Sequence, residues 1–206
     1  MSATTSSMLR YDALKAIYPR LEECVVVTIM GAVSAELQDI GHRPNFFYLQ
    51  HAMGLASSMG LGIALARPEL QVIVLDGDGS ILMNLGGLTT LARYRPPNLL
   101  HIVFDNESLL SVGGFPTATS TGSDIAGVAA AAGVPRTARV DTLPAFTAAV
   151  DEALAAGELT TLVAKVAAAG PKVFLTDLPL LENRFQFART LRDFKGRAPD
   201  GYHAPS

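Results

Sequence analysis

The 206 residues are 49% hydrophobic and 17% charged, a balance that excludes an intrinsically disordered chain and supports one domain with a full core. A net charge of -3 and an isoelectric point near 5.8 exclude the basic surface that nucleic acids and acidic membranes require. The single cysteine, Cys24, excludes an internal disulfide and any multi-cysteine metal site within one chain.

No segment has the length of a membrane span, because the apolar stretch over residues 53–66 is shorter than the ~20 residues that a bilayer requires. The first residues carry neither the positive charge nor the apolar run of a secretory signal, and we expect a loose tail over residues 1–7. These features are typical of a cytoplasmic protein with no membrane partner.

Strand-like and helix-like segments alternate along the chain. Short, β-branched apolar runs predict strands over 24–29, 46–49, 71–75, 99–104, 137–140 and 160–166. Helices are expected over 34–40, 53–67, 81–94, 124–133 and 143–156, and a long loop over 106–122. This alternation predicts an α/β fold over residues 8–169, a doubly wound parallel sheet with helices on both faces. Residues 170–206 are expected to form an extension, with a helix near 180–194, that packs on the domain or on a partner.

One short segment carries the strongest chemical signal. Asp76-Gly77-Asp78-Gly79-Ser80 leaves a predicted strand and opens a helix, and ligands of parallel sheets bind beyond the carboxyl ends of their strands. The two glycines that flank Asp78 allow a sharp turn and a close approach to a ligand. A metal that bridges the Asp78 carboxylate to a phosphate would satisfy both the acid and the free N–H groups of the helix.

Other interpretations of this segment are weaker, with one exception. An EF-hand needs Gly and Glu where the chain has Ile81 and Gly87, and a Walker loop needs a lysine that is absent from this turn. The dinucleotide fingerprint is only half present, at Gly60 and Gly62, and falls inside a helix. A tight turn capped by Asp78, with no ligand, remains an equal alternative on this segment alone.

The next strand along the chain ends in a second pair of polar residues, Asp105 and Asn106. One helix and one strand separate this pair from Asp78, so both should lie at the ends of nearby strands. A carboxylate and an amide oxygen that converge there are hard ligands, of the kind that Mg²⁺ prefers.

With these two elements the chain resembles the thiamine-diphosphate enzymes, whose cofactor motif is Gly-Asp-Gly followed after a similar interval by an Asn pair, here Asp105-Asn106. The resemblance implies that Asp78, the side chain of Asn106 and the main-chain carbonyl of Ser108 bind Mg²⁺. Many family members have glycine at this position, so Ser108 departs from the family pattern. Serine can still act as the ligand, because only its main-chain carbonyl is needed. The residues implied at the diphosphate are Ser34, Gly77, Gly79 and Ser80.

A third element agrees with this resemblance. Family members place a large apolar residue at a set interval before the motif's acid, to hold thiamine diphosphate in its bent form, and Met53 occupies that position. The carbonyl of His51 would accept a hydrogen bond from the amino group of the cofactor. Core packing for Met53, a surface role for the His51 side chain and an ordinary helix cap for Ser34 remain the alternatives.

More narrowly, four segments resemble the branch of the family that includes sulfopyruvate decarboxylase β subunits and phosphonopyruvate decarboxylases. The segments are 45–48, 53–62, 76–86 and 183–185, and the resemblance covers roughly residues 8–190. The loop after Asn106 departs from that branch, which tends to have Gly and Tyr where this chain has residues 107–113.

Full-length enzymes of this family also contain a pyrimidine-binding domain, whose glutamate activates the cofactor. The resemblance therefore implies half of an active site, completed in an oligomer by a separate pyrimidine-binding subunit that supplies this glutamate. The implied activity is decarboxylation of a small anionic 2-oxoacid such as sulfopyruvate or phosphonopyruvate. Three alternatives remain: an acetolactate-synthase-like carboligase subunit, a non-catalytic Mg²⁺–phosphate-binding regulatory subunit, and an unrelated Rossmann-like nucleotide protein.

Overall fold

The computed structural model describes residues 8–172 and 178–199. The loose tail expected over residues 1–7 lies outside these ranges, as does part of the expected C-terminal extension. No helix among the described residues is long and apolar enough to cross a membrane.

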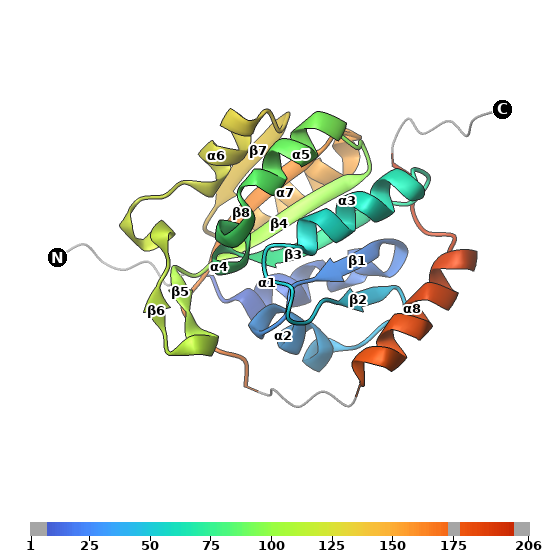
Figure 1. The fold of residues 1–206 in the computed structure, drawn as a ribbon, viewed down its shortest axis with the longest axis horizontal. Helices are drawn as coiled ribbons and strands as arrows, with labels where there is room; N and C mark the ends of the chain where they lie inside the picture. The colour runs from blue at the N-terminus through green and yellow to red at the C-terminus, as the bar shows by residue number, and fades with distance from the viewer. Residues whose placement is uncertain (1–7, 173–177, 200–206) are drawn as a thin grey trace.

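A six-stranded parallel sheet forms the centre of the molecule (Figure 1). Its strand order is β2-β1-β3-β4-β8-β7, so the chain leaves β1 toward one edge and then crosses over it to β3. The strands are β1 (Val25–Thr28), β2 (Phe46–Tyr48), β3 (Val72–Gly77), β4 (Leu99–Asp105), β7 (Arg136–Val140) and β8 (Thr160–Lys165). The predicted doubly wound α/β fold is confirmed, and its chain reversal at β1 and β3 is where such folds bind ligands.

Helices cover both faces of the sheet (Figure 1). On one face, α3 contacts β3 and α5, and α5 contacts α6; on the other, α1 contacts α2 and α7. The helices are α1 (Arg10–Ile17), α2 (Ala32–Ile40), α3 (Ala56–Ala66), α4 (Asp78–Ile81), α5 (Gly86–Tyr94), α6 (Ile125–Ala132), α7 (Leu143–Ala156) and α8 (Leu180–Asp193). Short 3₁₀ turns follow α1 at Tyr18–Glu23 and α4 at Leu82–Asn84.

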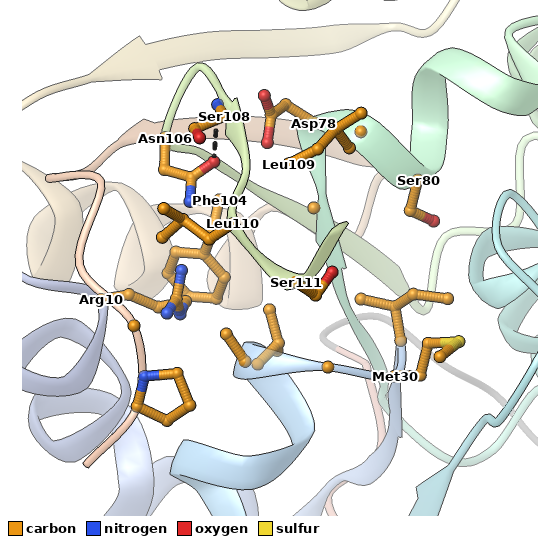
Figure 2. Close-up of a pocket in the computed structure, with 18 of the residues that line it drawn as sticks. Arg10, Met30, Asp78, Ser80, Phe104, Asn106, Ser108, Leu109, Leu110 and Ser111 are labelled. Atoms are coloured by element: carbon orange, nitrogen blue, oxygen red, sulfur yellow. Dashed lines mark hydrogen bonds between the residues drawn. The ribbon is translucent and has the colours of Figure 1, made fainter. Parts of the chain in front are cut away.

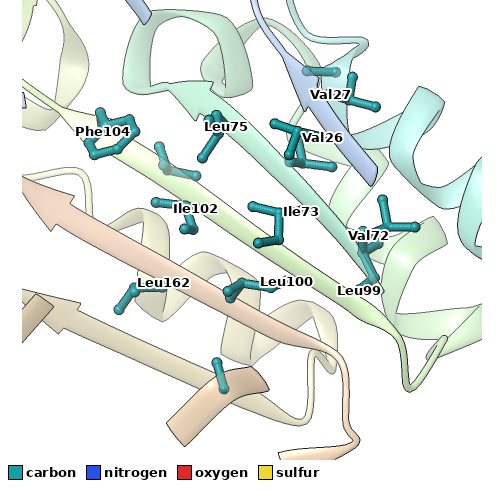
Figure 3. Packing of buried hydrophobic residues seen from close by; sticks show 14 of the residues in the cluster. Val26, Val27, Val72, Ile73, Leu75, Leu99, Leu100, Ile102, Phe104 and Leu162 are labelled. Carbon is teal, nitrogen blue, oxygen red and sulfur yellow. The ribbon is translucent and has the colours of Figure 1, made fainter. Parts of the chain in front are cut away.

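The core consists mainly of branched aliphatic side chains on the central strands (Figure 3). Val26, Ile73 and Ile102 come from β1, β3 and β4, and each is fully buried. Because both faces of these strands lie under helices, their sequences are nearly continuous apolar runs, interrupted in β4 by His101, without the alternation of a half-exposed strand. This core holds the strand ends, which carry the site, in a fixed register.

Several predicted boundaries are wrong near the strand ends. Helix α2 begins before Ser34, at Ala32, because Gly31 adopts a left-handed φ of 83° that ends the preceding turn. Helix α3 begins after Met53, at Ala56, because Gly54 at φ 82° breaks the helical path. The helix predicted over 81–94 is divided by the 3₁₀ turn, and α1 has no counterpart among the predicted elements.

The predicted loop over 106–122 has structure of its own. It contains a small antiparallel pair, β5 (Ser108–Leu109) with β6 (Phe115–Pro116), and two 3₁₀ turns at Leu110–Val112 and Ala118–Thr121. This hairpin follows the end of β4 (Figure 1) and contains Ser108, one of the expected metal ligands.

The C-terminal helix α8 lies along the edge strand β2. The buried Asn183 side chain accepts a hydrogen bond from the Tyr48 N–H at 3.0 Å and donates one to the Phe46 carbonyl at 2.8 Å. These bonds satisfy main-chain groups that an edge strand would otherwise expose.

Candidate cofactor and metal site

A cavity of about 180 Å³ opens at the carboxyl ends of β1, β3 and β4 (Figure 2). Pockets that enclose a whole drug-sized ligand are larger, roughly 300–1,000 Å³, so this cavity encloses only part of such a ligand. Of the residues implied by the sequence, seven line it: Met53, Gly77, Asp78, Gly79, Ser80, Asn106 and Ser108. The fold thus brings together segments from three different strand ends.

The Asp78 carboxylate lies buried at the top of this cavity. Its Oδ2 accepts a hydrogen bond of 2.6 Å from the Thr117 hydroxyl. Burial raises the pKa of the Asp78 carboxyl; the Thr117 hydroxyl opposes this shift, and the charge of Asp105 adds to it. A cation beside Asp78 would relieve the cost of its buried negative charge.

Asn106 and Ser108 form a turn directly after β4. The Asn106 Oδ1 accepts a hydrogen bond from the Ser108 N–H at 3.1 Å, which sets the direction of the amide side chain. Between them Glu107 adopts a left-handed φ of 58°, a strained conformation for a non-glycine residue. Such strain is typical of functional turns, because the surrounding structure must maintain it.

The donor set fits magnesium. Asp78, Asn106 and Ser108 would offer a carboxylate, an amide oxygen and a main-chain carbonyl, all hard ligands. Among the described residues, no group of three or more His, Cys, Asp or Glu side chains could hold a metal by itself. A cation here would therefore depend on neutral oxygens and on a ligand phosphate, as Mg²⁺ sites commonly do.

The cavity also has room for a phosphate group beside two glycines. A Cβ added to Gly77 or to Gly31 would meet no atom within 4 Å, so the main chain at both positions borders open space. Gly79 differs, because an added Cβ there would come within 2.3 Å of the Leu109 side chain. The first two glycines leave space for a ligand, and the third allows the hairpin to pack closely.

The turn that contains Met53 and Gly54, here called the Met53 turn, is hydrogen-bonded to the segment that follows Asp78. The Gly54 N–H donates to the Ser80 hydroxyl at 2.9 Å, and the Asn84 side chain donates to the Gly54 carbonyl at 2.8 Å. A side chain at position 54 would collide with Asn84, at 2.8 Å. Met53 is therefore held at the cavity wall, while Asn84 is a supporting residue that the sequence motif did not indicate.

Two implied residues do not line the cavity. Ser34 lies inside α2, is buried, and accepts a long hydrogen bond of 3.5 Å from Gln38, so the alternative role as a helix cap is wrong, while its implied diphosphate contact stays a prediction. The His51 side chain is exposed, and its main chain has a left-handed φ of 53° with the N–H directed to the Met30 sulfur at 3.2 Å. The strained main chain at His51 is consistent with a role for its carbonyl.

Asp76 and His101 form a buried pair at the start of the turn over residues 76–80. Asp76 Oδ1 accepts the Gly77 N–H at 2.9 Å, and Oδ2 lies 3.2 Å from His101 Nε2. Both side chains are fully buried. They fix the main chain just before Asp78.

Two threonines hydrogen-bond the loop over 106–122 to carboxylates at the strand ends, and the sequence motifs did not indicate either of them. Thr117 donates to Asp78, and the Thr119 hydroxyl donates to Asp105 at 2.8 Å. Lys165 at the end of β8 also contacts Asp105, at 2.9 Å. Asp105, the first member of the Asp-Asn pair, therefore anchors the loop.

Arg10 is a further residue of the cavity wall for which the sequence offered no signal. It comes from α1, is 5% exposed, and forms a two-point ion pair with Glu36 of α2 at 2.8 and 3.0 Å. Arg10 and Glu36 lie far apart in the chain, and no local pattern links them.

The chain is similar to known proteins in family, sequence and fold. Residues 30–164 match the family "Thiamine pyrophosphate enzyme, C-terminal TPP binding domain". The β subunit of sulfopyruvate decarboxylase from Methanocaldococcus jannaschii is 33% identical over 89% of this chain and 97% of its own length. The same subunit from Methanothermobacter thermautotrophicus is 47% identical over 50% of this chain and 56% of its own length.

Longer proteins match through one part of their length. Phosphonopyruvate decarboxylase from Streptomyces viridochromogenes is 42% identical over 64% of this chain, which spans 32% of that enzyme. The crystal structure of benzoylformate decarboxylase from Polynucleobacter necessarius aligns with a TM-score of 0.68 at 21% identity, over 84% of this chain and 36% of that one. The last similarity establishes the fold alone.

Proposed function

Because the chain belongs to the thiamine pyrophosphate enzymes through their C-terminal cofactor-binding domain, we propose that it is the diphosphate-binding subunit of a thiamine-diphosphate-dependent decarboxylase. The family resemblance inferred from the motifs is confirmed by these matches. The proposed substrate is a small anionic 2-oxoacid such as sulfopyruvate or phosphonopyruvate. The observation that carries the proposal is the convergence of Asp78, Asn106, Ser108 and Met53 on one cavity.

In this proposal Mg²⁺ is bound by the Asp78 carboxylate, the Asn106 amide oxygen and the Ser108 carbonyl. The open space beside Gly77 accommodates the diphosphate, and the Ser80 hydroxyl lies in the same wall. Because Ser80 already accepts the Gly54 N–H, its own hydrogen remains available to donate to a phosphate oxygen.

When bound, thiamine diphosphate would supply a nucleophilic carbon for the 2-oxo group and an electron sink for the electrons of the bond to CO₂. The part of this chain is to hold and shape the cofactor. Met53 lies in the cavity wall, where it would support the bent form, and the His51 carbonyl would accept a hydrogen bond from the cofactor's amino group. A relative that matches nearly the whole chain is a decarboxylase subunit, which favours decarboxylation over carboligation.

A separate pyrimidine-binding chain would complete the site. The cavity encloses only part of a cofactor, and exposed apolar side chains of the 106–122 loop stand beside it, namely Leu110, Val112 and Phe115. Such a patch is suited to burial against a partner. The partner would supply the activating glutamate and form an oligomer with this chain; the cytoplasmic location stays a prediction.

The proposal is tested by calorimetric titration with thiamine diphosphate, with and without Mg²⁺. The wild-type chain is expected to bind only with Mg²⁺; Asp78→Ala should abolish this binding, and Asn106→Ala should weaken it less because a neutral ligand is lost. Asp141→Ala, which removes an exposed carboxylate outside the cavity, is the control. Equal affinity of the wild type and Asp78→Ala at excess Mg²⁺ would contradict the metal assignment.

A further inference from the structure

Arg10 is a buried cation with part of its hydrogen-bonding capacity unused. Its Nε donates to Glu36 Oε2, and its Nη2 donates to Glu36 Oε1 and to the Ala169 carbonyl at 3.0 Å. These three bonds use every hydrogen of Nε and Nη2. Within residues 8–172 and 178–199, Nη1 has no hydrogen-bond partner, although Arg10 lines the cavity.

The pairing with Glu36 fixes the direction of the guanidinium plane. An ion pair with side chains 4% and 6% exposed contributes little net stability, because removing both charges from water costs about as much as their attraction returns. The pair does, however, hold a rigid, planar donor at a set position. The free edge of that donor is suited to a phosphate oxygen, to which guanidinium groups bind strongly.

The position of Arg10 in the cavity indicates which part of the cofactor it would contact. Figure 2 shows Arg10 on the same side of the cavity as Asn106 and Leu110, with Ser80 and Met30 on the opposite side. Met30 contacts the turn that carries Met53, through the His51 N–H, so the reacting end of the cofactor lies toward Met30, and a phosphate bound by Ser80 on that side would be the inner one. Arg10 therefore lies at the far end from the chemistry.

Charge in the cavity supports the same assignment. Arg10 is the only basic residue among those that line it, in the part of the chain that the structure describes. The negative charges of a diphosphate and of ionised Asp78 together exceed the two positive charges of one Mg²⁺. Arg10 is paired with Glu36 and adds no net charge, but its free N–H groups would stabilise an outer phosphate whose charge Mg²⁺ leaves partly uncompensated.

We infer that Arg10 binds the outer phosphate of the cofactor through Nη1, with Glu36 as the positioning residue that orients it. This inference rests on the proposed function and assigns a ligand contact outside the Asp-Asn motif. It implies that Arg10 distinguishes a diphosphate from a monophosphate, because only the outer phosphate reaches it.

The test compares thiamine diphosphate with thiamine monophosphate, by calorimetry at saturating Mg²⁺ on the full chain. The double variant R10M/E36L replaces both charges by apolar groups, so neither is left buried and unpaired. It is expected to lose about tenfold or more in affinity for the diphosphate, as for one charge-assisted hydrogen bond, and to bind the monophosphate as the wild type does. Glu36→Gln keeps an acceptor for Arg10 but frees its charge, and should strengthen diphosphate binding.

The matched control is R20M/D151L, which removes a more exposed ion pair between the 3₁₀ turn after α1 and α7; it should leave both affinities unchanged. Thermal unfolding checks that each variant is folded. Equal losses for the two ligands, or no loss for either, would overturn the assignment of Arg10 while leaving the proposed function intact. Failure of the wild type to bind the diphosphate would overturn the proposed function, and the assignment of Arg10 with it.

Discussion

At the scale of single residues, the candidate site contains a buried carboxylate and strained main-chain conformations, which lower the stability of the fold when no ligand is bound. Burial raises the pKa of the Asp78 carboxyl, and the charge of the nearby Asp105 adds to this shift, so the fold destabilises the ionised carboxylate of Asp78 relative to water. His51 and Glu107 maintain left-handed main-chain conformations at the edges of the same site. These features are typical of sites that bind a cation and a ligand, because binding offsets the cost.

The pH dependence of stability follows from the direction of the Asp78 shift. Since the folded pKa lies above the unfolded value, the folded state binds more protons in the window between them, and stability falls as pH rises through it. Without metal, Asp78→Asn should therefore raise the melting temperature by a few degrees at neutral pH. This advantage over the wild type should shrink as the pH is lowered through the raised pKa.

Thermal unfolding of both proteins across an acidic to neutral pH series, in the presence of a chelator, measures this effect. Asp141→Asn serves as the control at an exposed carboxyl. A variant Asp78→Asn less stable than the wild type at neutral pH would show that the ionised carboxylate contributes to the ligand-free fold.

At the scale of elements, the segment over 106–122 connects the proposed metal site to the expected partner surface. Its inner side carries Thr117 and Thr119, which contact the strand-end carboxylates, and its outer side carries Val112 and Phe115, which are 60% and 65% exposed. One segment thus faces both the ligand and the solvent. Its position should depend on the hydroxyl contacts at the strand ends.

Thr117→Val tests this dependence, since valine keeps the shape and removes the hydroxyl. The Asp78 carboxylate then loses a short, charge-assisted hydrogen bond, of the kind that contributes about 1.5–3 kcal/mol. We expect Mg²⁺-dependent cofactor affinity to fall by about tenfold or more, and proteolysis within 106–122 to become faster.

The matched control is Thr121→Val, because the Thr121 hydroxyl is exposed and donates only to the nearby Ala118 carbonyl. Thr117→Ser, which retains the hydroxyl, should recover most of the affinity. If valine and serine at position 117 behave alike, the hydroxyl does not orient Asp78.

At the scale of the whole molecule, the candidate site at the carboxyl end of the sheet encloses only part of a ligand. The strand ends, the Met53 turn and the 106–122 hairpin surround a small cavity, and apolar side chains such as Leu55 and Phe115 are exposed on the flanking segments. Relatives such as phosphonopyruvate decarboxylase extend well beyond the part that this chain matches. Both observations favour an active site shared between chains.

The chain by itself should therefore lack decarboxylase activity and gain it with a pyrimidine-binding partner. The measurement supplies the purified chain with thiamine diphosphate, Mg²⁺ and a panel of 2-oxoacids that includes sulfopyruvate and phosphonopyruvate, and follows CO₂ release. Phe115→Asp should impair activation by the partner without changing the fold of the isolated chain. Robust turnover by the isolated chain would require a catalytic acid within these residues.

The sequence by itself determined the strands of the central sheet, the class of fold and the two polar motifs. Buried parallel strands such as 71–75 are recognisable because both of their faces are apolar, a property of consecutive residues. Asp78 and Asn106 were predictable as neighbours because each directly follows a strand, and parallel strands end at the same edge of a sheet.

Only the tertiary structure decided which other residues reach these motifs. Arg10 meets Glu36, and Thr117 meets Asp78, across long stretches of chain whose paths depend on how helices and loops pack. Helix α2 begins at Ala32, directly after Gly31, so Ser34 lies within the helix and outside the cavity wall. Contacts of this kind depend on packing between distant segments, and periodicity and spacing along the chain do not encode them.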